Sequence, residues 1–151
     1  MRSVLWKREQ CFSPPFTVLT LTLAQGGLVG QLVQVQLQVE MPDNGFYMLV
    51  EDQLPGGLEA LNESLNTSSH QAVADGEPQY TWQQYGYNEK EVHDDRVTFF
   101  ITEMGAGYHP FAYLARVTRA GVFVAMPAQA YAMYDATKWG RSSSQTFVVG
   151  A

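Results

Sequence analysis

The segment 33–41 constrains the fold more than any other part of the chain. Apolar residues at every second position (Val33, Val35, Leu37, Val39, Met41) alternate with Gln34, Gln36, Gln38 and Glu40. Successive side chains of a strand point to opposite faces, so this alternation predicts a strand with one buried and one polar face. We interpret the glutamine face as solvent-facing, with contact to another domain as the alternative. No apolar stripe with a helical period persists for three turns anywhere in the sequence.

Similar signals predict strands on both sides of this segment. The run 16–24 alternates at Leu19, Leu21 and Leu23, which favours a strand over the alternative of a weak signal peptide after the basic N-terminus. Asn44-Gly45 predicts a tight hairpin turn with positive φ, followed by a strand over 46–51.

Further strands are predicted over 80–85, 97–102, 111–117, 122–126 and 145–149. We expect a loop or short helical turn over 58–79, a charged corner over 89–96, and an irregular segment or one helical turn over 128–139. Seven to eight short strands predict an all-β fold, an antiparallel immunoglobulin-like β-sandwich. We expect one domain over 17–151, with 1–16 unassigned. The positions predicted to be buried are Val33, Val35, Leu37, Val39, Phe99, Ile101, Tyr113, Ala115, Val122 and Val124.

The composition excludes several classes of function. Of the 151 residues, 46% are hydrophobic and 16% charged, which argues for a globular chain and against disorder. The net charge of −6 argues against nucleic-acid binding and against docking on anionic lipid. A single cysteine, Cys11, excludes an internal disulfide and a multi-cysteine zinc site. No apolar run is long enough to insert into a membrane.

The sequence contains no recognised catalytic or cofactor motif. His70, His93 and His109 lack the spacing of metal ligands, so we expect no metal and no cofactor. His93-Asp94-Asp95 has the elements of a carboxylate-oriented base, but we favour a solvated corner. We therefore expect a protein that is not an enzyme.

Four separated motifs carry a family resemblance. The segment 50–59 includes Glu51, Asp52, Pro55 and Gly57, and Asp94-Asp95-Arg96-Val97 follows. The third motif is 113–117, which contains Arg116, followed by 121–123. The fourth leads from Pro127 through Met133-Tyr134 to Gly140-Arg141-Ser142. In this order, over about residues 28–149, they resemble the C-terminal macroglobulin-like domain of bacterial alpha-2-macroglobulins.

The resemblance implies a macroglobulin-like β-sandwich and a role within a larger protein. Alpha-2-macroglobulins are multidomain protease traps, and many members expose a buried thioester when a protease cuts their bait region. The resemblance assigns Met133 and Tyr134 to a pair that shields this thioester, because apolar side chains keep out the water that would hydrolyse it. It implies a non-enzymatic domain of a bacterial endopeptidase inhibitor, in the periplasm or outside the cell.

The implied partners are neighbouring domains of the larger chain and, indirectly, target proteases. The family's thioester motif is Cys-Leu-Glu-Gln, whereas Glu9-Gln10-Cys11 has the reverse order and lies outside the match, so we expect no thioester within this chain.

Two expectations concern individual side chains. We expect Met133 and Tyr134 to form one apolar surface patch on an irregular segment; the alternative is that both pack inside the domain. We expect Arg116, within an apolar strand, to pair with a carboxylate such as Asp94, Asp95 or Asp52.

The alternative to the inhibitor role is an immunoglobulin-like adhesion or carbohydrate-binding module. Its sugar-stacking platform would be formed by four aromatic residues, Tyr80, Trp82, Tyr85 and Tyr87, although core packing also explains them.

Overall fold

The computed structural model describes residues 6–7, 17–22, 27–62 and 86–150, and this part of the chain contains strands and no helix. The strands are β1 (Trp6–Lys7), β2 (Thr17–Thr22), β3 (Gly27–Leu28), β4 (Leu32–Met41), β5 (Gly45–Gln53), β6 (Leu58–Ala60), β7 (Glu89–Val92), β8 (Arg96–Met104), β9 (Gly107–Val117), β10 (Gly121–Ala125), β11 (Gln129–Ala132), β12 (Asp135–Arg141) and β13 (Gln145–Gly150). The predicted segments 80–85 and 63–79, with Tyr80, Trp82 and Tyr85, lie outside the described residues.

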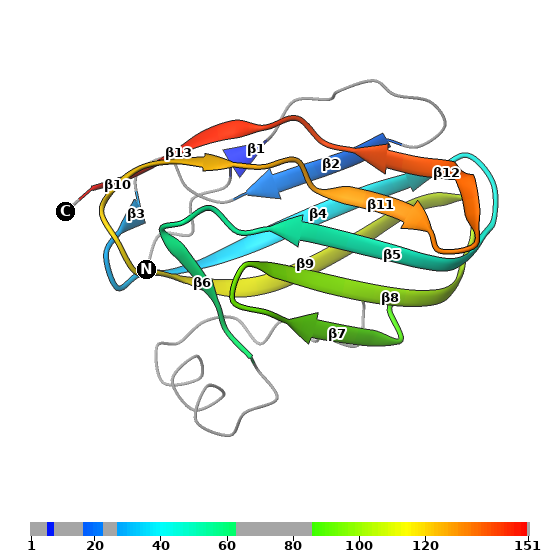
Figure 1. Ribbon diagram of the computed structural model, residues 1–151, viewed down its shortest axis with the longest axis horizontal. Helices are drawn as coiled ribbons and strands as arrows, with labels where there is room; N and C mark the ends of the chain where they lie inside the picture. Colours follow the sequence, from blue (N-terminus) through cyan, green and yellow to red (C-terminus); the bar gives the residue numbers. More distant parts are fainter. Residues whose placement is uncertain (1–5, 8–16, 23–26, 63–85, 151) are drawn as a thin grey trace.

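Two five-stranded sheets form the layers of a sandwich (Figure 1). One has the order β1-β2-β4-β9-β6 and the other β12-β11-β5-β8-β7; we call them the β4–β9 sheet and the β5–β8 sheet. A third sheet, β10-β13-β3, lies at one end, and its β13–β3 pair is the one parallel pair among the described strands. The predicted antiparallel sandwich is confirmed. β1, within the unassigned segment 1–16, pairs with β2.

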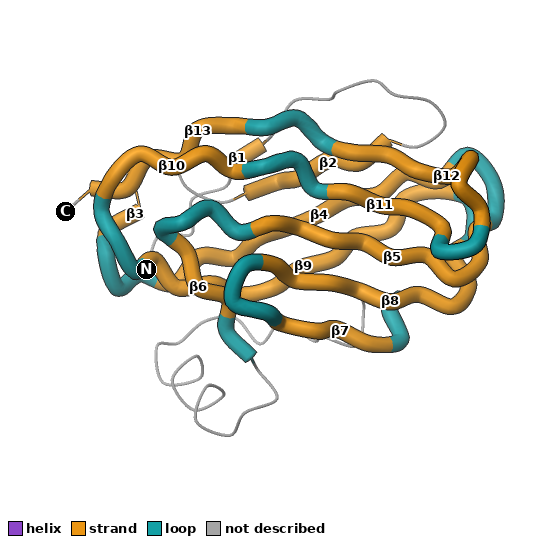
Figure 2. Tube along the Cα trace, in the orientation of Figure 1, coloured by secondary structure: helices purple, strands orange, loops and turns teal. Residues whose placement is uncertain are grey.

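The predicted number of strands was too low, because the short strands were missed. Figure 2 shows strand at two places where a corner or an irregular segment was expected. β7 pairs with β8, and β11 forms a hairpin with β12. β6 is only three residues long, and the edge strand β7 reads Glu-Lys-Glu-Val, so neither carries the apolar alternation that identifies a half-buried strand.

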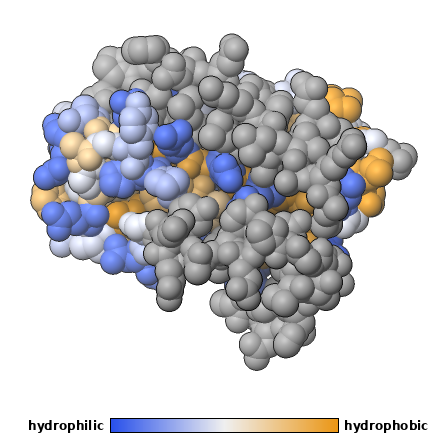
Figure 3. Space-filling view, turned by 180° about the vertical axis from the view of Figure 1, so that it is seen from behind, coloured by the Kyte–Doolittle hydropathy of each residue, from blue (hydrophilic) through white to orange (hydrophobic). Residues whose placement is uncertain are grey.

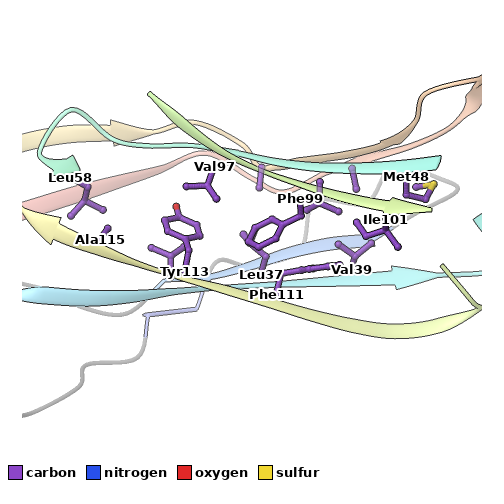
Figure 4. Close-up of a cluster of buried hydrophobic side chains, with 14 of the residues drawn as sticks. Leu37, Val39, Met48, Leu58, Val97, Phe99, Ile101, Phe111, Tyr113 and Ala115 are labelled. Carbon is purple, nitrogen blue, oxygen red and sulfur yellow. The ribbon is translucent and has the colours of Figure 1, made fainter. Parts of the chain in front are cut away.

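The hydrophobic core lies between the two large sheets (Figure 4). The rings of Phe99 and Phe111 approach each other from opposite layers, with centroids 5.2 Å apart. Eight predicted core positions are confirmed as buried: Val33, Val35, Leu37, Val39, Phe99, Ile101, Tyr113 and Ala115.

The predictions for Val122 and Val124 are wrong, since these side chains are 70% and 61% exposed. The alternation of β10 was recognised, but its phase is reversed: Phe123 packs against the core and Ala125 is buried. Figure 3 shows hydrophobic atoms at the surface of the end that carries this small sheet.

The glutamine face of β4 is less exposed than predicted. Gln34 is buried although it lies on the face opposite Val33 and Val35. It pairs across the sheet with the buried Leu114, and its Oε1 accepts a hydrogen bond from Gln36 Nε2 at 3.3 Å. The predicted inward phase of this strand is therefore correct, but its outer face is partly covered.

The turn after Met41 is not the predicted hairpin. β4 and β5 belong to different sheets, so residues 42–44 cross between the layers, and neither Asn44 nor Gly45 has positive φ. Close packing explains the glycine: a Cβ at Gly45 would lie 2.7 Å from Met41 Cε and 2.8 Å from Met48 Sδ. Asn44 Oδ1 instead accepts a hydrogen bond from the backbone N–H of Ala106 at 3.0 Å.

Candidate functional site

Met133 and Tyr134 form the two-residue turn of the β11–β12 hairpin, in which Ala132 lies opposite Asp135. The predicted irregular segment is therefore wrong, but the predicted surface position is confirmed. Met133 is 46% exposed and Tyr134 is 82% exposed, which excludes the alternative that both pack in the core.

A bulge in β12 shapes this turn. Tyr131 lies opposite Trp139 while Ala132 lies opposite Asp135, so the segment 136–138 is left without partners in β11. Within the bulge, Asp135 Oδ1 accepts hydrogen bonds from Thr137 Oγ1 at 2.6 Å and from Thr137 N at 3.1 Å. These bonds lower the pKa of Asp135, with a smaller contribution from the charge of Lys138. The residue after Tyr134 is thus held as a carboxylate.

Lys138 connects the hairpin to the crossing turn 42–44. Its Nζ donates a hydrogen bond to the backbone oxygen of Asn44 at 2.7 Å and lies 3.3 Å from Asp43 Oδ1. The two turns belong to segments far apart in the sequence but lie at the same end of the sandwich (Figure 1).

Tyr47 of β5 contacts both residues of the β11–β12 turn. The backbone N–H of Met133 donates to the Tyr47 oxygen at 3.0 Å. The rings of Tyr47 and Tyr134 meet edge to face, with centroids 5.4 Å apart and planes at 85°. Phe46 and Tyr47 are 57% and 53% exposed. We call Phe46, Tyr47, Met133 and Tyr134 the tip patch.

The tip patch can bind an apolar or aromatic surface, but it contains no nucleophile and no carboxylate pair. The described residues contain no group of three or more histidine, cysteine or acidic side chains that could hold a metal ion. Within the same ranges, no helix is long and apolar enough to cross a membrane. The chemistry of the patch is therefore that of a contact surface.

The motif residues Glu51, Asp95 and Arg96 lie together where β5 meets the start of β8. The Arg96 guanidinium is 3.8 Å from Glu51 Oε2 and 3.4 Å from Asp95 Oδ1. The backbone oxygen of Asp95 also accepts a hydrogen bond from Leu54 N at 2.8 Å. Asp94 is exposed in the β7–β8 turn. These residues support the fold at a distance from the tip patch.

Asp52 has a structural position between the two layers. It is buried, and its Oδ2 accepts a hydrogen bond from the Tyr113 hydroxyl at 2.7 Å. Because Asp52 belongs to the β5–β8 sheet and Tyr113 to the β4–β9 sheet, this bond joins the layers through the core.

Pro55 and Gly57 shape the short connection from β5 to β6. The backbone oxygen of Pro55 accepts a hydrogen bond from Leu58 N at 2.9 Å. A Cβ at Gly57 would lie 2.5 Å from the ring of Phe123, so the glycine allows the close approach of that ring.

Arg116 does not lie where the predicted pairing with Asp52 requires. Tyr113 points into the core, and the strict alternation of β9 places Arg116 on the opposite face of the sheet. A carboxylate in the core cannot reach it there. The residue directly opposite Arg116 on β6 is Glu59.

Gly140 and Arg141 belong to the base of the hairpin that carries the tip. They lie opposite Ala130 and Gln129, with Gly140 buried and Arg141 exposed. Next to them, Ser142 N donates to the Ala128 oxygen at 2.8 Å, and Ser142 Oγ accepts from Ala128 N at 2.9 Å. The fourth motif therefore surrounds the hairpin.

Two residues of the patch, Phe46 and Tyr47, were missed as site residues. The sequence placed them in a regular strand, and no local signal connects them with residues 133–134. The fold and the patch together define a β-sandwich domain with an exposed apolar contact surface at one end.

Comparison with known proteins identifies the family of this domain. Residues 20–136 match the model of the bacterial alpha-2-macroglobulin MG10 domain. The alpha-2-macroglobulin of Thermotoga maritima is 24% identical over 147 residues, which are 95% of this chain and 9% of that protein. An alpha-2-macroglobulin homolog of Nostoc sp. is 27% identical over 131 residues, covering 85% of this chain and 6% of the relative.

A solved structure shares the fold. In Escherichia coli alpha-2-macroglobulin activated by porcine elastase, the matching part has a TM-score of 0.79 and 23% identity, and it covers 94% of this chain and 14% of that chain. The chain belongs to the bacterial alpha-2-macroglobulin MG10 domain family, and it spans less than a tenth of the length of the two curated relatives.

Proposed function

We propose that this domain covers the thioester-bearing domain of a larger alpha-2-macroglobulin chain and shields the thioester with Met133 and Tyr134. Its role in endopeptidase inhibition is indirect: it keeps the reactive group dry until a protease cuts the chain elsewhere. The domain itself catalyses no reaction. We place the whole protein in the periplasm or outside the cell, in accord with the family.

The observation that carries the proposal is the exposure of Met133 and Tyr134 on a two-residue turn that is anchored to two other strands. The family resemblance assigns the shielding pair to these positions. A flexible thioether and a large ring adapt to an apolar surface and displace its water. Burying the Met133 side chain would contribute about 1.5–3 kcal/mol to such a contact.

The carbohydrate-binding alternative loses one of its four aromatic residues. Tyr87 packs against the core, and its ring centroid lies 5.2 Å from that of Phe99. A sugar-stacking residue needs a free ring face, whereas this ring supports the sandwich.

The test uses the full-length protein that carries this domain. We expect Met133→Ala with Tyr134→Ala to increase the rate at which methylamine releases the thioester thiol before any protease is added, because water and small amines gain access. Thiol release is measured with a chromogenic disulfide reagent. The stability of the domain should change by no more than about 0.5 kcal/mol, since both residues are at the surface.

Val122→Ala with Val124→Ala is the matched control, because it also truncates two exposed apolar side chains but in a different sheet. Its amine reactivity should equal that of the wild type. Equal reactivity of the tip variant and the wild type would refute the shielding role, as would a wild-type protein that releases no thiol even after cleavage by a protease.

A further inference from the structure

Tyr47 has an unusual backbone conformation for a residue with a side chain. Its φ of 52° lies in the left-handed region, and it is the one non-glycine residue with positive φ in the described part of the chain. Such a conformation is uncommon outside glycine and is maintained only when the surroundings favour it. Yet the Tyr47 ring is half exposed, so burial of the ring does not explain the conformation.

The left-handed residue changes the phase of β5. Gly45 and Met48 are both buried, and the two residues between them are both exposed, whereas a regular strand would place one of the two inward. The pairing with β8 continues in the same register on both sides, from Gly45 opposite Met104 to Met48 opposite Ile101. The consequence is that Phe46 and Tyr47 both face outward at the end of the sandwich.

The same conformation aims two groups of Tyr47 at the β11–β12 turn. Its carbonyl accepts the hydrogen bond from Met133 N, and its ring meets the edge or face of the Tyr134 ring. One contact is made by the backbone and the other by the side chain. Both residues of the turn are therefore held by a single residue of a different strand.

We propose that Tyr47 is the positioning residue that pre-orders Met133 and Tyr134 for docking. This inference rests on the proposed shielding function and extends it to a residue outside the turn. A surface that is ordered before it binds loses less conformational entropy on binding. The patch on this domain then consists of a contact pair, Met133 and Tyr134, and a support, Tyr47.

Three substitutions separate the backbone from the ring. Tyr47→Gly retains the left-handed conformation and removes the ring. Tyr47→Phe retains the ring and tests the hydroxyl alone. Tyr47→Asn removes the ring with a residue that tolerates the left-handed region, and it replaces the glycine variant if that variant fails to fold.

The first measurement uses NMR spectroscopy of the 151-residue chain. We expect the ring protons of Tyr134 to shift toward the values of a solvated tyrosine in Tyr47→Gly and Tyr47→Asn, because the neighbouring ring is lost. They should stay in place in Tyr47→Phe. The Met133 amide should remain protected from hydrogen exchange in all three, since the backbone carbonyl is retained. Unchanged Tyr134 shifts in both ring-deleting variants would overturn the proposal.

The second measurement is methylamine reactivity of the full-length protein. We expect Tyr47→Gly and Tyr47→Asn to increase it by about 2- to 10-fold, the change in population that one edge-to-face ring contact supports, and Tyr47→Phe to leave it unchanged. If the Met133–Tyr134 double variant increases reactivity and the Tyr47 variants do not, the positioning role is wrong and shielding stands. If neither increases it, the proposed function itself is wrong.

Discussion

Replacing Tyr113 with phenylalanine should destabilise the sandwich, because it removes the hydroxyl that joins the two layers. Tyr113 is 1% exposed and Asp52 is 2% exposed, and the hydroxyl donates to Asp52 Oδ2 at 2.7 Å. The substitution leaves a carboxyl group in the core with one hydrogen bond fewer and no access to water in exchange. Losing such a bond costs about 1–3 kcal/mol.

Urea unfolding of the 151-residue chain measures this loss. For a domain of this size we expect Tm to fall by roughly 2–12 °C, and the urea midpoint to fall without a change in the slope m. Tyr108→Phe is the control, because it makes the same chemical change at a side chain that is 63% exposed. Its stability should equal that of the wild type.

The coupling of the two groups can be measured directly. In a double-mutant cycle of Tyr113→Phe and Asp52→Asn, the effects should fall short of additivity, because both substitutions disturb the same bond. Fully additive effects, or equal midpoints for Tyr113→Phe and Tyr108→Phe, would refute a bond between the layers as a source of stability.

Two further predictions concern a glycine and a carboxyl group. Gly57→Ala should lower the free energy of unfolding by about 1–3 kcal/mol, because its Cβ would lie 2.5 Å from the Phe123 ring; Gly86→Ala, with no atom within 4 Å, should show no such loss in the same urea titration. Asp135 should titrate below its ordinary pKa of 3.8, because Thr137 donates to its charged form, so this local stabilisation is present at neutral pH and is lost as the pH falls through the lowered pKa. NMR titration of the Thr137 amide checks this, and a midpoint at or above 3.8 would contradict it.

The amino-acid sequence alone determined the class of fold and most of the core. Alternation is a local property of a strand, so the inward phase of β4 and the buried positions of β8 and β9 could be predicted without knowing which strands pair. The exposure of Met133 and Tyr134 could also be predicted, because their segment lacks the alternation of a strand with one buried face.

Only the tertiary structure decided how these elements combine. The reversed phase of β10 depends on which face of a small sheet is covered, and Val122 and Val124 look like core residues until that sheet is placed. The crossing turn 42–44 looks like a hairpin until its strands are assigned to different layers. Tyr47 became part of the site only through its contact with a hairpin more than eighty positions along the chain. Such contacts arise from pairing and packing between distant segments, which a local pattern does not encode.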